Sequence, residues 1–196
     1  RLEEALDYFH QALQIDEQLG DLRGKAVRLN NIAIIFENQG RVDEALDYFH
    51  QALQIDEQLG DLRGKATILN NIGDILKEQE QLDEALDYFH QALQIDEQLG
   101  DLRGKSITLK NIGGVLYWQD RSDEALEYHQ KSLQIAEQLG EIRSKAVSLN
   151  DIGLVLEDLG RLDEALEYYQ QALQIAERLD IQHMVKTIQK NIDTLG

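Results

Sequence analysis

The feature that most constrains this chain is an internal repeat with a period of 40 residues. The string EALDYFHQALQIDEQLGDLRGK occurs three times without a change, at 4–25, 44–65 and 84–105. Diverged copies begin at Glu124 and Glu164, and no linker separates the copies. Self-similarity at a fixed period of this length indicates an array in which each unit packs on its neighbours.

Each copy contains two apolar stripes with helical spacing. In one copy the first stripe is Leu69, Ile72, Gly73 and Leu76, and the second is Ala85, Leu86, Phe89, Ala92 and Leu93. The chain has no proline, so no residue is missing the backbone donor that a helix needs. Two helices joined by a short turn pack antiparallel. A single hairpin cannot bury its apolar stripe, so successive hairpins must stack.

The stripes predict about ten helices, which alternate between a helix A and a helix B of each repeat. We predict B helices at about 2–19, 42–59, 82–99, 122–139 and 162–179. We predict A helices near 22–38, 62–79, 102–118, 142–159 and 181–195. The chain is then one array with four full repeats, at 22–59, 62–99, 102–139 and 142–179.

The two ends of the array differ. Residues 1–19 are a helix B without its helix A, and we interpret this start as a cut within a longer array. We expect its apolar face to be open to self-association; that face is Leu2, Ala5, Leu6, Phe9 and Ala12. Residues 181–196 keep Ile188, Ile192 and Leu195 but become polar at Gln189 and Asp193, with Gly196 as the terminal residue. An array end needs a polar outer face, so we expect a C-terminal capping helix.

On these residues the chain resembles the tetratricopeptide repeat, whose pattern is W-x2-L-G-x2-Y followed by A-x3-F-x2-A. One copy here reads Leu69-x2-Ile72-Gly73-x2-Leu76, then Ala85-x3-Phe89-x2-Ala92. The 40-residue period is similar to the extended variant in kinesin light chain and Pins-type polarity adaptors. The first aromatic and the closing proline of the pattern are missing. The resemblance covers the whole chain and implies an all-α, right-handed superhelical α-solenoid of antiparallel helix hairpins, with ligands in a concave groove lined by the A helices.

Small residues recur where helices A and B of one repeat should cross. They are Ala33, Gly73, Gly113 and Gly153 on the A helices, and Ala45, Ala85, Ala125 and Ala165 on the B helices. The turn between repeats has Gly60 followed by Asp61, which is typical of a helix C-cap and then an N-cap. The turn inside a repeat has Gly40 and Gly160, but Glu80 and Asp120 stand at the matching positions.

The formal charge is −18. Such a field repels the phosphates of nucleic acids and anionic membranes, so a neutral or basic polypeptide is the better partner. No apolar run approaches the ~20 residues of a membrane span, and the first residues show no signal-peptide pattern. The chain has no cysteine, which is compatible with the cytoplasm, where we expect it.

The groove that the resemblance implies predicts a peptide-binding surface on the A helices. Its residues are Asn30, Ile34, Asn70, Asp74, Lys77, Lys110, Tyr117, Trp118, Asn150 and Leu154. The column Asn30, Asn70, Lys110, Asn150 and Lys190 recurs every 40 residues. Its amides either contact a peptide backbone or, with the adjacent Asn31, Asn71, Asn111 and Asn191, join neighbouring helices. Trp118 is either a binding hot spot beside Tyr117 or packs on the following turn.

No residue pattern points to catalysis, a cofactor or a metal. His10, His50 and His90 stand one repeat apart, and His129 and His183 are isolated. We expect the helix B carboxylates to be solvated; they are Asp16, Glu17, Asp56, Glu57, Asp96 and Glu97. We expect the Arg–Lys pairs that begin the A helices to offset neighbouring acids; they are Arg23 with Lys25, Arg63 with Lys65, Arg103 with Lys105, and Arg143 with Lys145.

The sequence therefore predicts a non-enzymatic interaction scaffold that holds a peptide in the groove. Two alternatives stay open. One is a ligand-sensing arm of a larger signalling protein. The other is a structural array that assembles through residues 1–19.

Overall fold

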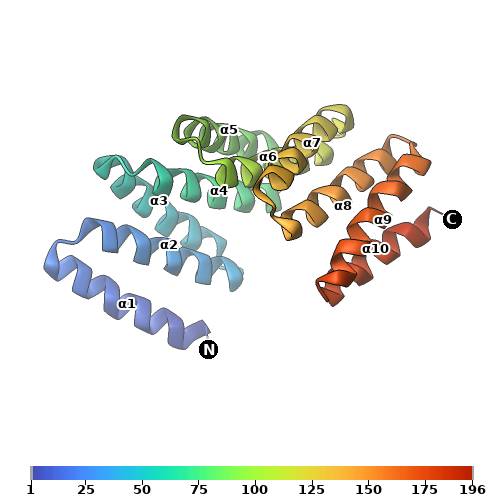
Figure 1. The fold of residues 1–196 in the computed structure, drawn as a ribbon. Helices are drawn as coiled ribbons and strands as arrows, with labels where there is room; N and C mark the ends of the chain where they lie inside the picture. Colours follow the sequence, from blue (N-terminus) through green and yellow to red (C-terminus); the bar gives the residue numbers. More distant parts are fainter. Residues whose placement is uncertain (1, 196) are drawn as a thin grey trace. The chain divides into compact units, whose positions relative to one another are not determined.

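The computed structural model describes residues 2–195, which form ten α-helices (Figure 1). The helices are α1 Leu2–Leu19, α2 Leu22–Asn38, α3 Val42–Leu59, α4 Leu62–Glu78, α5 Leu82–Leu99, α6 Leu102–Trp118, α7 Ser122–Leu139, α8 Ile142–Asp158, α9 Leu162–Arg178 and α10 Gln182–Thr194. The even-numbered helices are the predicted A helices and the odd-numbered ones are the predicted B helices. The all-α prediction is confirmed.

Neighbouring helices pack as sequential antiparallel pairs, which are α2 with α3, α4 with α5, α6 with α7, and α8 with α9. The contacts divide the chain into two compact units, Arg1–Leu99 and Gly100–Gly196. In the first unit α1 packs on α2, and α3 packs on α4, which connects the α2–α3 pair to the α4–α5 pair. In the second unit α7 packs on α8, and α10 packs on α9. The predicted single right-handed superhelix concerns both units together and stays a prediction.

The small residues do allow helices A and B to cross closely, as predicted. A Cβ atom added to Gly73 would lie 2.6 Å from Cε1 of Phe89, and one added to Gly153 would lie 2.5 Å from Cε1 of Tyr169. Ala85 and Ala165 on the facing helices are completely buried. Since real Cβ atoms do not approach other atoms so closely, the large ring on helix B requires glycine opposite.

The turns are closed by residues in the left-handed backbone region. Gly60 ends α3 with φ of 65°, and the Asp61 carboxylate then accepts a hydrogen bond of 3.0 Å from the Gly64 N–H at the start of α4. Both caps were predicted. Gly40 has φ of 72°, and Glu80 adopts nearly the same conformation at the matching turn, with φ of 62°.

Replacing Glu80 by glycine is expected to raise the free energy of unfolding by about 1 kcal/mol, because a residue with a Cβ is strained at this φ. Urea denaturation measures the change. Gly40→Ala is the reverse experiment and should lose about 1 kcal/mol. No atom lies within 4 Å of a Cβ placed on Gly40, so only the backbone conformation is changed. An unchanged midpoint for Glu80→Gly would show that this turn relaxes without strain.

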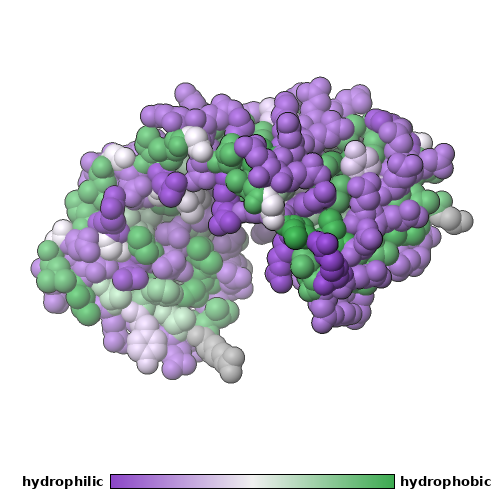
Figure 2. All heavy atoms as spheres, viewed as in Figure 1, coloured by the Kyte–Doolittle hydropathy of each residue, from purple (hydrophilic) through white to green (hydrophobic). Residues whose placement is uncertain are grey.

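Helix α1 is the least covered element of the first unit. It has no buried residue, and Leu19 is 75% exposed and Ile15 is 55% exposed. On the face drawn in Figure 2, hydrophobic residues reach the surface at this end of the unit. Of the predicted open face, Leu2 is exposed, whereas Ala5, Leu6, Phe9 and Ala12 are half-buried against α2. Self-association through this face stays a prediction.

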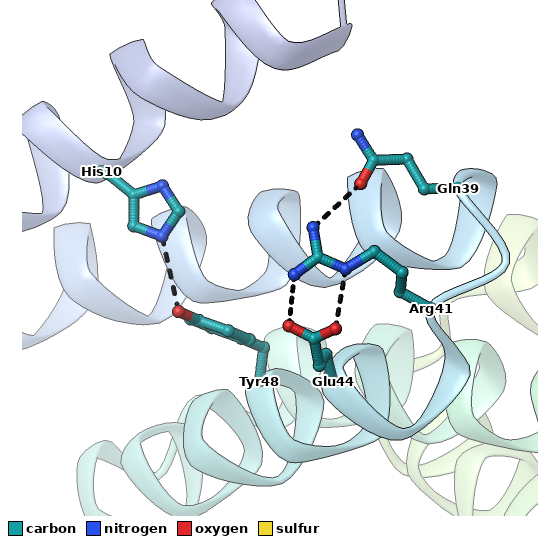
Figure 3. Close-up of polar contacts among 5 residues, drawn as sticks. All are labelled: His10, Gln39, Arg41, Glu44 and Tyr48. Carbon is teal, nitrogen blue, oxygen red and sulfur yellow. Dashed lines mark hydrogen bonds and ion pairs between the residues drawn. The ribbon is translucent and has the colours of Figure 1, made fainter.

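Polar contacts fix α1 and the α2–α3 turn to the rest of the first unit (Figure 3). The His10 ring meets Tyr48 edge-on, with 3.4 Å between His10 Nε2 and the Tyr48 hydroxyl. Arg41 donates two hydrogen bonds to Glu44 and lies over the Phe36 ring, 4.1 Å from its centroid. The same arginine–glutamate pair recurs as Arg121 with Glu124 and Arg161 with Glu164.

Helix α10 has the polar outer side that the sequence predicts. Ile188 is completely buried, whereas Gln189 and Asp193 are exposed and joined by a hydrogen bond of 2.9 Å. Gly196, the third predicted position, lies outside the described residues.

Candidate functional site

The asparagine columns join neighbouring A helices. Asn71 on α4 donates a hydrogen bond of 3.1 Å to the Asn30 side chain on α2, and Asn191 on α10 donates one of 3.1 Å to Asn150 on α8. The structural interpretation therefore holds for these two pairs. Asn70 donates its side-chain N–H to the Ala66 carbonyl at 3.1 Å. Contact between this column and a ligand stays a prediction.

A charged pair replaces the amide pair between α6 and α8. Lys110 stands at the position of Asn30, and Asp151 stands at the position of Asn71. Burial raises the pKa of Asp151 to about 6, while Lys110 and a hydrogen bond with Asn150 act in the opposite direction. Between α6 and α8, an electrostatic attraction of Lys110 for Asp151 thus stands where the other pairs have an amide hydrogen bond.

A cavity of about 210 Å³ lies between the N-terminal halves of α2 and α4, with α3 as its floor. We call it the α2–α4 cavity; its lining is Arg23, Ala26, Val27, Asn30, Asp56, Asp61, Gly64, Thr67 and Ile68. Among these residues, only Asn30 belongs to the predicted binding set. Arg23 forms an ion pair of 3.2 Å with Asp61 at its rim.

The second unit has a cavity of about 170 Å³ in the equivalent place, between α6 and α8. We call it the α6–α8 cavity; its lining is Ser106, Ile107, Lys110, Ser132, Glu141, Arg143, Ser144, Val147 and Ser148. Its floor consists of buried hydroxyls. Ser132 donates to the Ser106 carbonyl at 2.8 Å and lies 3.4 Å from the Ser148 hydroxyl. Lys110 is the member of the predicted set that lines this cavity.

The expectation that the helix B aspartates are solvated is wrong. Asp56 is 6% exposed and Asp96 is 4% exposed. The start of the next A helix crosses over this position, and a Cβ on Gly64 would collide with the Asp56 carboxylate. Burial and the neighbouring Asp61 raise the pKa of Asp56 to about 6, against the opposing effect of Arg23.

The sequence did contain a signal for this burial. Each of Asp16, Asp56 and Asp96 is followed eight residues later by glycine, at Gly24, Gly64 and Gly104. The two other repeats lose both residues together, with Ala136 before Ser144 and Ala176 before Met184. An aspartate at this position of helix B therefore requires glycine at the facing position of the next A helix.

The arginine–lysine column offsets neighbouring acids, as predicted. Lys25 pairs with Glu17 at 2.8 Å, Lys65 with Glu57 at 2.7 Å, and Lys145 with Glu137 at 2.7 Å. Arg103 donates to Glu141 at 2.6 Å, which repeats the Arg23–Asp61 pair one unit later.

The C-terminal ends of the A helices are acidic. Burial raises the pKa of Glu37 on α2, and the carboxylates of Glu78 and Asp74 on α4 raise it further. Asp74 forms an ion pair of 2.7 Å with Lys77. In the second unit, burial and the carboxylates Asp158, Glu157 and Asp120 raise the pKa of Tyr117.

The remaining predicted residues lie on the same helices but outside both cavities. Ile34 on α2 and Leu154 on α8 are half-buried, as is Tyr117 on α6. Trp118, the last residue of α6, is 65% exposed. So exposed a side chain contributes little packing, which weakens the interpretation that Trp118 packs on the following turn.

His129, which the sequence predicts only to be isolated from the other histidines, is a buried core residue. It is 3% exposed and occupies the position of Phe49, Phe89 and Tyr169 in the other repeats. Burial and the nearby Lys110 lower its pKa to about 4. Alignment to the A-x3-F pattern from Ala125 would have identified it.

Within residues 2–195, no group of three or more histidine, aspartate or glutamate side chains could hold a metal ion. In the same part of the chain no helix combines the length and the apolar character of a membrane span. The two cavities and the acidic ends of the A helices make the surface of these helices the candidate binding surface.

The comparisons with known proteins agree with this architecture. A family model described as tetratricopeptide repeat matches residues 1–58, 26–98 and 104–178. Among solved structures, the chain is similar to the crystal structure of BtubC (BKLC) from P. vanneervenii, with a TM-score of 0.85 and 15% sequence identity. That match covers 100% of this chain and 83% of the other. No curated protein matches the sequence.

Proposed function

Because this chain belongs to the tetratricopeptide repeat family, whose members are in general protein–protein interaction modules, we propose that it binds a basic polypeptide segment on the surface of its A helices. The proposed binding surface comprises the predicted residues and the residues that line the two cavities. The proposal includes no catalytic role for the chain.

The observation that carries the proposal is the placement of carboxylates in the last turns of the A helices. Glu37 is the penultimate residue of α2, whereas Glu78 and Asp158 are the last residues of α4 and α8. A helix C-terminus carries a partial negative charge, so carboxylates there are unfavourable by about 0.3–1 kcal/mol each. A cationic partner relieves this repulsion, and the net charge of −18 attracts such a partner from a distance.

Trp118 gives the sharpest test of this surface. Peptides selected from a random library on the immobilised protein are measured by calorimetry against Trp118→Ala. We expect affinity to fall at least tenfold, roughly the loss typical of an aromatic hot spot. Tyr8→Ala is the matched control, since Tyr8 is also 65% exposed but lies on a B helix.

Equal losses in the two variants would place the peptide off the A-helix surface, and a library without any basic binder would refute the proposal. Asn70→Ala and Lys110→Ala address the asparagine column in the same assay. Unchanged affinity for every recovered peptide would assign that column to helix pairing alone.

Assembly through α1 is the second candidate function, because the exposed Leu2, Ile15 and Leu19 lie on this helix. Light scattering at high protein concentration distinguishes it from the first. A monomer throughout would rule out assembly without affecting peptide binding.

A further inference from the structure

The α2–α4 cavity contains a buried carboxylate that forms no ion pair within the described residues, although the charge of Arg23 at the rim lowers its pKa. Asp56 on α3 lines the cavity and is 6% exposed. Within residues 2–195, no hydrogen bond or ion pair reaches this carboxylate. The Gly64 N–H at the start of α4 donates to Asp61 instead, and Arg23 pairs with Asp61 at the rim. A buried charge is normally paired, so this one requires explanation.

The preceding repeat contains the missing partner. Asp16 on α1 stands at the position equivalent to Asp56, and Arg28 on α2 forms an ion pair of 3.4 Å with it. The residue equivalent to Arg28 in the next repeat is Ile68, which lines the α2–α4 cavity. The protein thus pairs a guanidinium with this carboxylate in one repeat and leaves the same place apolar and open in the next.

We propose that the α2–α4 cavity takes an arginine side chain of the bound polypeptide, with the guanidinium on Asp56 and the aliphatic stem against Val27 and Ile68. This inference rests on the proposed function, since it identifies one side chain of the partner. The cavity contains two carboxylates, Asp56 and Asp61, and one cation, Arg23, so one further positive charge balances it. A guanidinium is more weakly hydrated than an ammonium and suits a buried carboxylate better.

The equivalent cavity of the second unit has a different selectivity. Ala136 replaces Asp56 there, and the floor is formed by the hydroxyls of Ser132 and Ser148. The one carboxylate in the lining of the α6–α8 cavity, Glu141, is already paired with Arg103. Lys110 and Arg143 add two positive charges to that lining. We therefore expect only the α2–α4 cavity to take a guanidinium.

The test uses small probes, so that it does not depend on a known peptide. The protein is labelled at its Val and Ile methyl groups and titrated with N-acetyl-arginine methylamide. The neutral isostere N-acetyl-citrulline methylamide and free L-arginine are titrated in parallel. The methyl signals of Val27 and Ile68, assigned through Val27→Ala and Ile68→Val, report on the cavity. Val147 reports on the α6–α8 cavity.

We expect the arginine probe to shift Val27 and Ile68 with a dissociation constant on the order of 1 mM, and to leave Val147 unchanged. Asp56→Asn should weaken this binding at least about tenfold, because the charge-assisted contact is lost. Asp47→Asn is the control. It removes the same charge from an exposed position of α3 and should bind as the unmodified protein does. Circular dichroism establishes that both variants are folded.

Three results would overturn the inference. They are no methyl shift, an equal shift from the citrulline probe, and undiminished binding in Asp56→Asn. Tighter binding of free L-arginine than of the blocked probe would assign the cavity to the amino acid instead of a polypeptide side chain. The peptide selection fails or succeeds independently of all these results, so the two proposals are separable.

Discussion

Replacing His129 by phenylalanine is expected to raise the free energy of unfolding of the second unit by about 1–3 kcal/mol at neutral pH. His129 is almost completely buried, and within the described chain its Nδ1 atom has no hydrogen-bond partner. Phenylalanine already fills the equivalent place at Phe89, opposite Gly73, and Gly113 leaves the same space opposite His129. The variant therefore removes an unpaired polar atom without a steric conflict.

The gain should grow as the pH falls. The pKa of His129 is about 4 in the folded protein, because of burial and of Lys110, against about 6.5 in an unfolded chain. Between these values the unfolded state binds more protons, so the histidine contributes less stability as the pH falls from 6.5 towards 4. From pH 7.5 to pH 5.5 the advantage of His129→Phe should increase by about 1 kcal/mol.

Urea denaturation of both proteins at these two pH values measures this difference. Asp151 has its pKa raised to about 6 and acts in the opposite sense, with stability that is present below its unfolded pKa and lost as the pH rises through 6. Because both proteins contain Asp151, its contribution cancels in the comparison. His90→Phe, at an exposed position of α5, should show no pH-dependent gain. An equal gain at both pH values would mean that the pKa of His129 is not lowered in the folded protein.

Helix positions were predictable because the 40-residue period places every stripe and cap in register. The predicted 62–79 is observed as Leu62–Glu78, and Gly60 and Asp61 cap the helices as expected. The crossing residues Gly73 and Phe89 were also identified, since the size of one constrains the other.

The candidate site was harder to predict, because burial depends on residues that are distant in the sequence. Asp16 and Asp56 stand in identical 22-residue strings, yet Arg28 pairs with the first and Ile68 leaves the second unpaired. Only the A helix that follows each string differs. The pattern of helix B alone therefore predicted solvated aspartates, because it contains no information about the A helix that covers them.

Because burial depends on the neighbouring helices, identical residues of the repeat should contribute differently to the free energy of unfolding. Phe9 and Phe49 occupy the same position of the 22-residue string. Phe49 on α3 is completely buried, whereas Phe9 on α1 is half-buried because no A helix precedes α1 within the described residues. Phe49→Ala is expected to lower the free energy of unfolding by about 3–5 kcal/mol, through lost burial and the cavity left behind.

Phe9→Ala is its matched control, with an expected loss of about 1 kcal/mol, since the side chain keeps part of its contact with water and its surroundings can close on the gap. Urea denaturation followed by circular dichroism gives both values, and amide hydrogen exchange locates the loss on α3 or α1. Local sequence is the same in the two variants, so helix propensity and capping cancel. Equal losses would therefore contradict the assignment of stability to packing between helices, and a large loss for Phe9→Ala would mean that another surface covers α1 in solution.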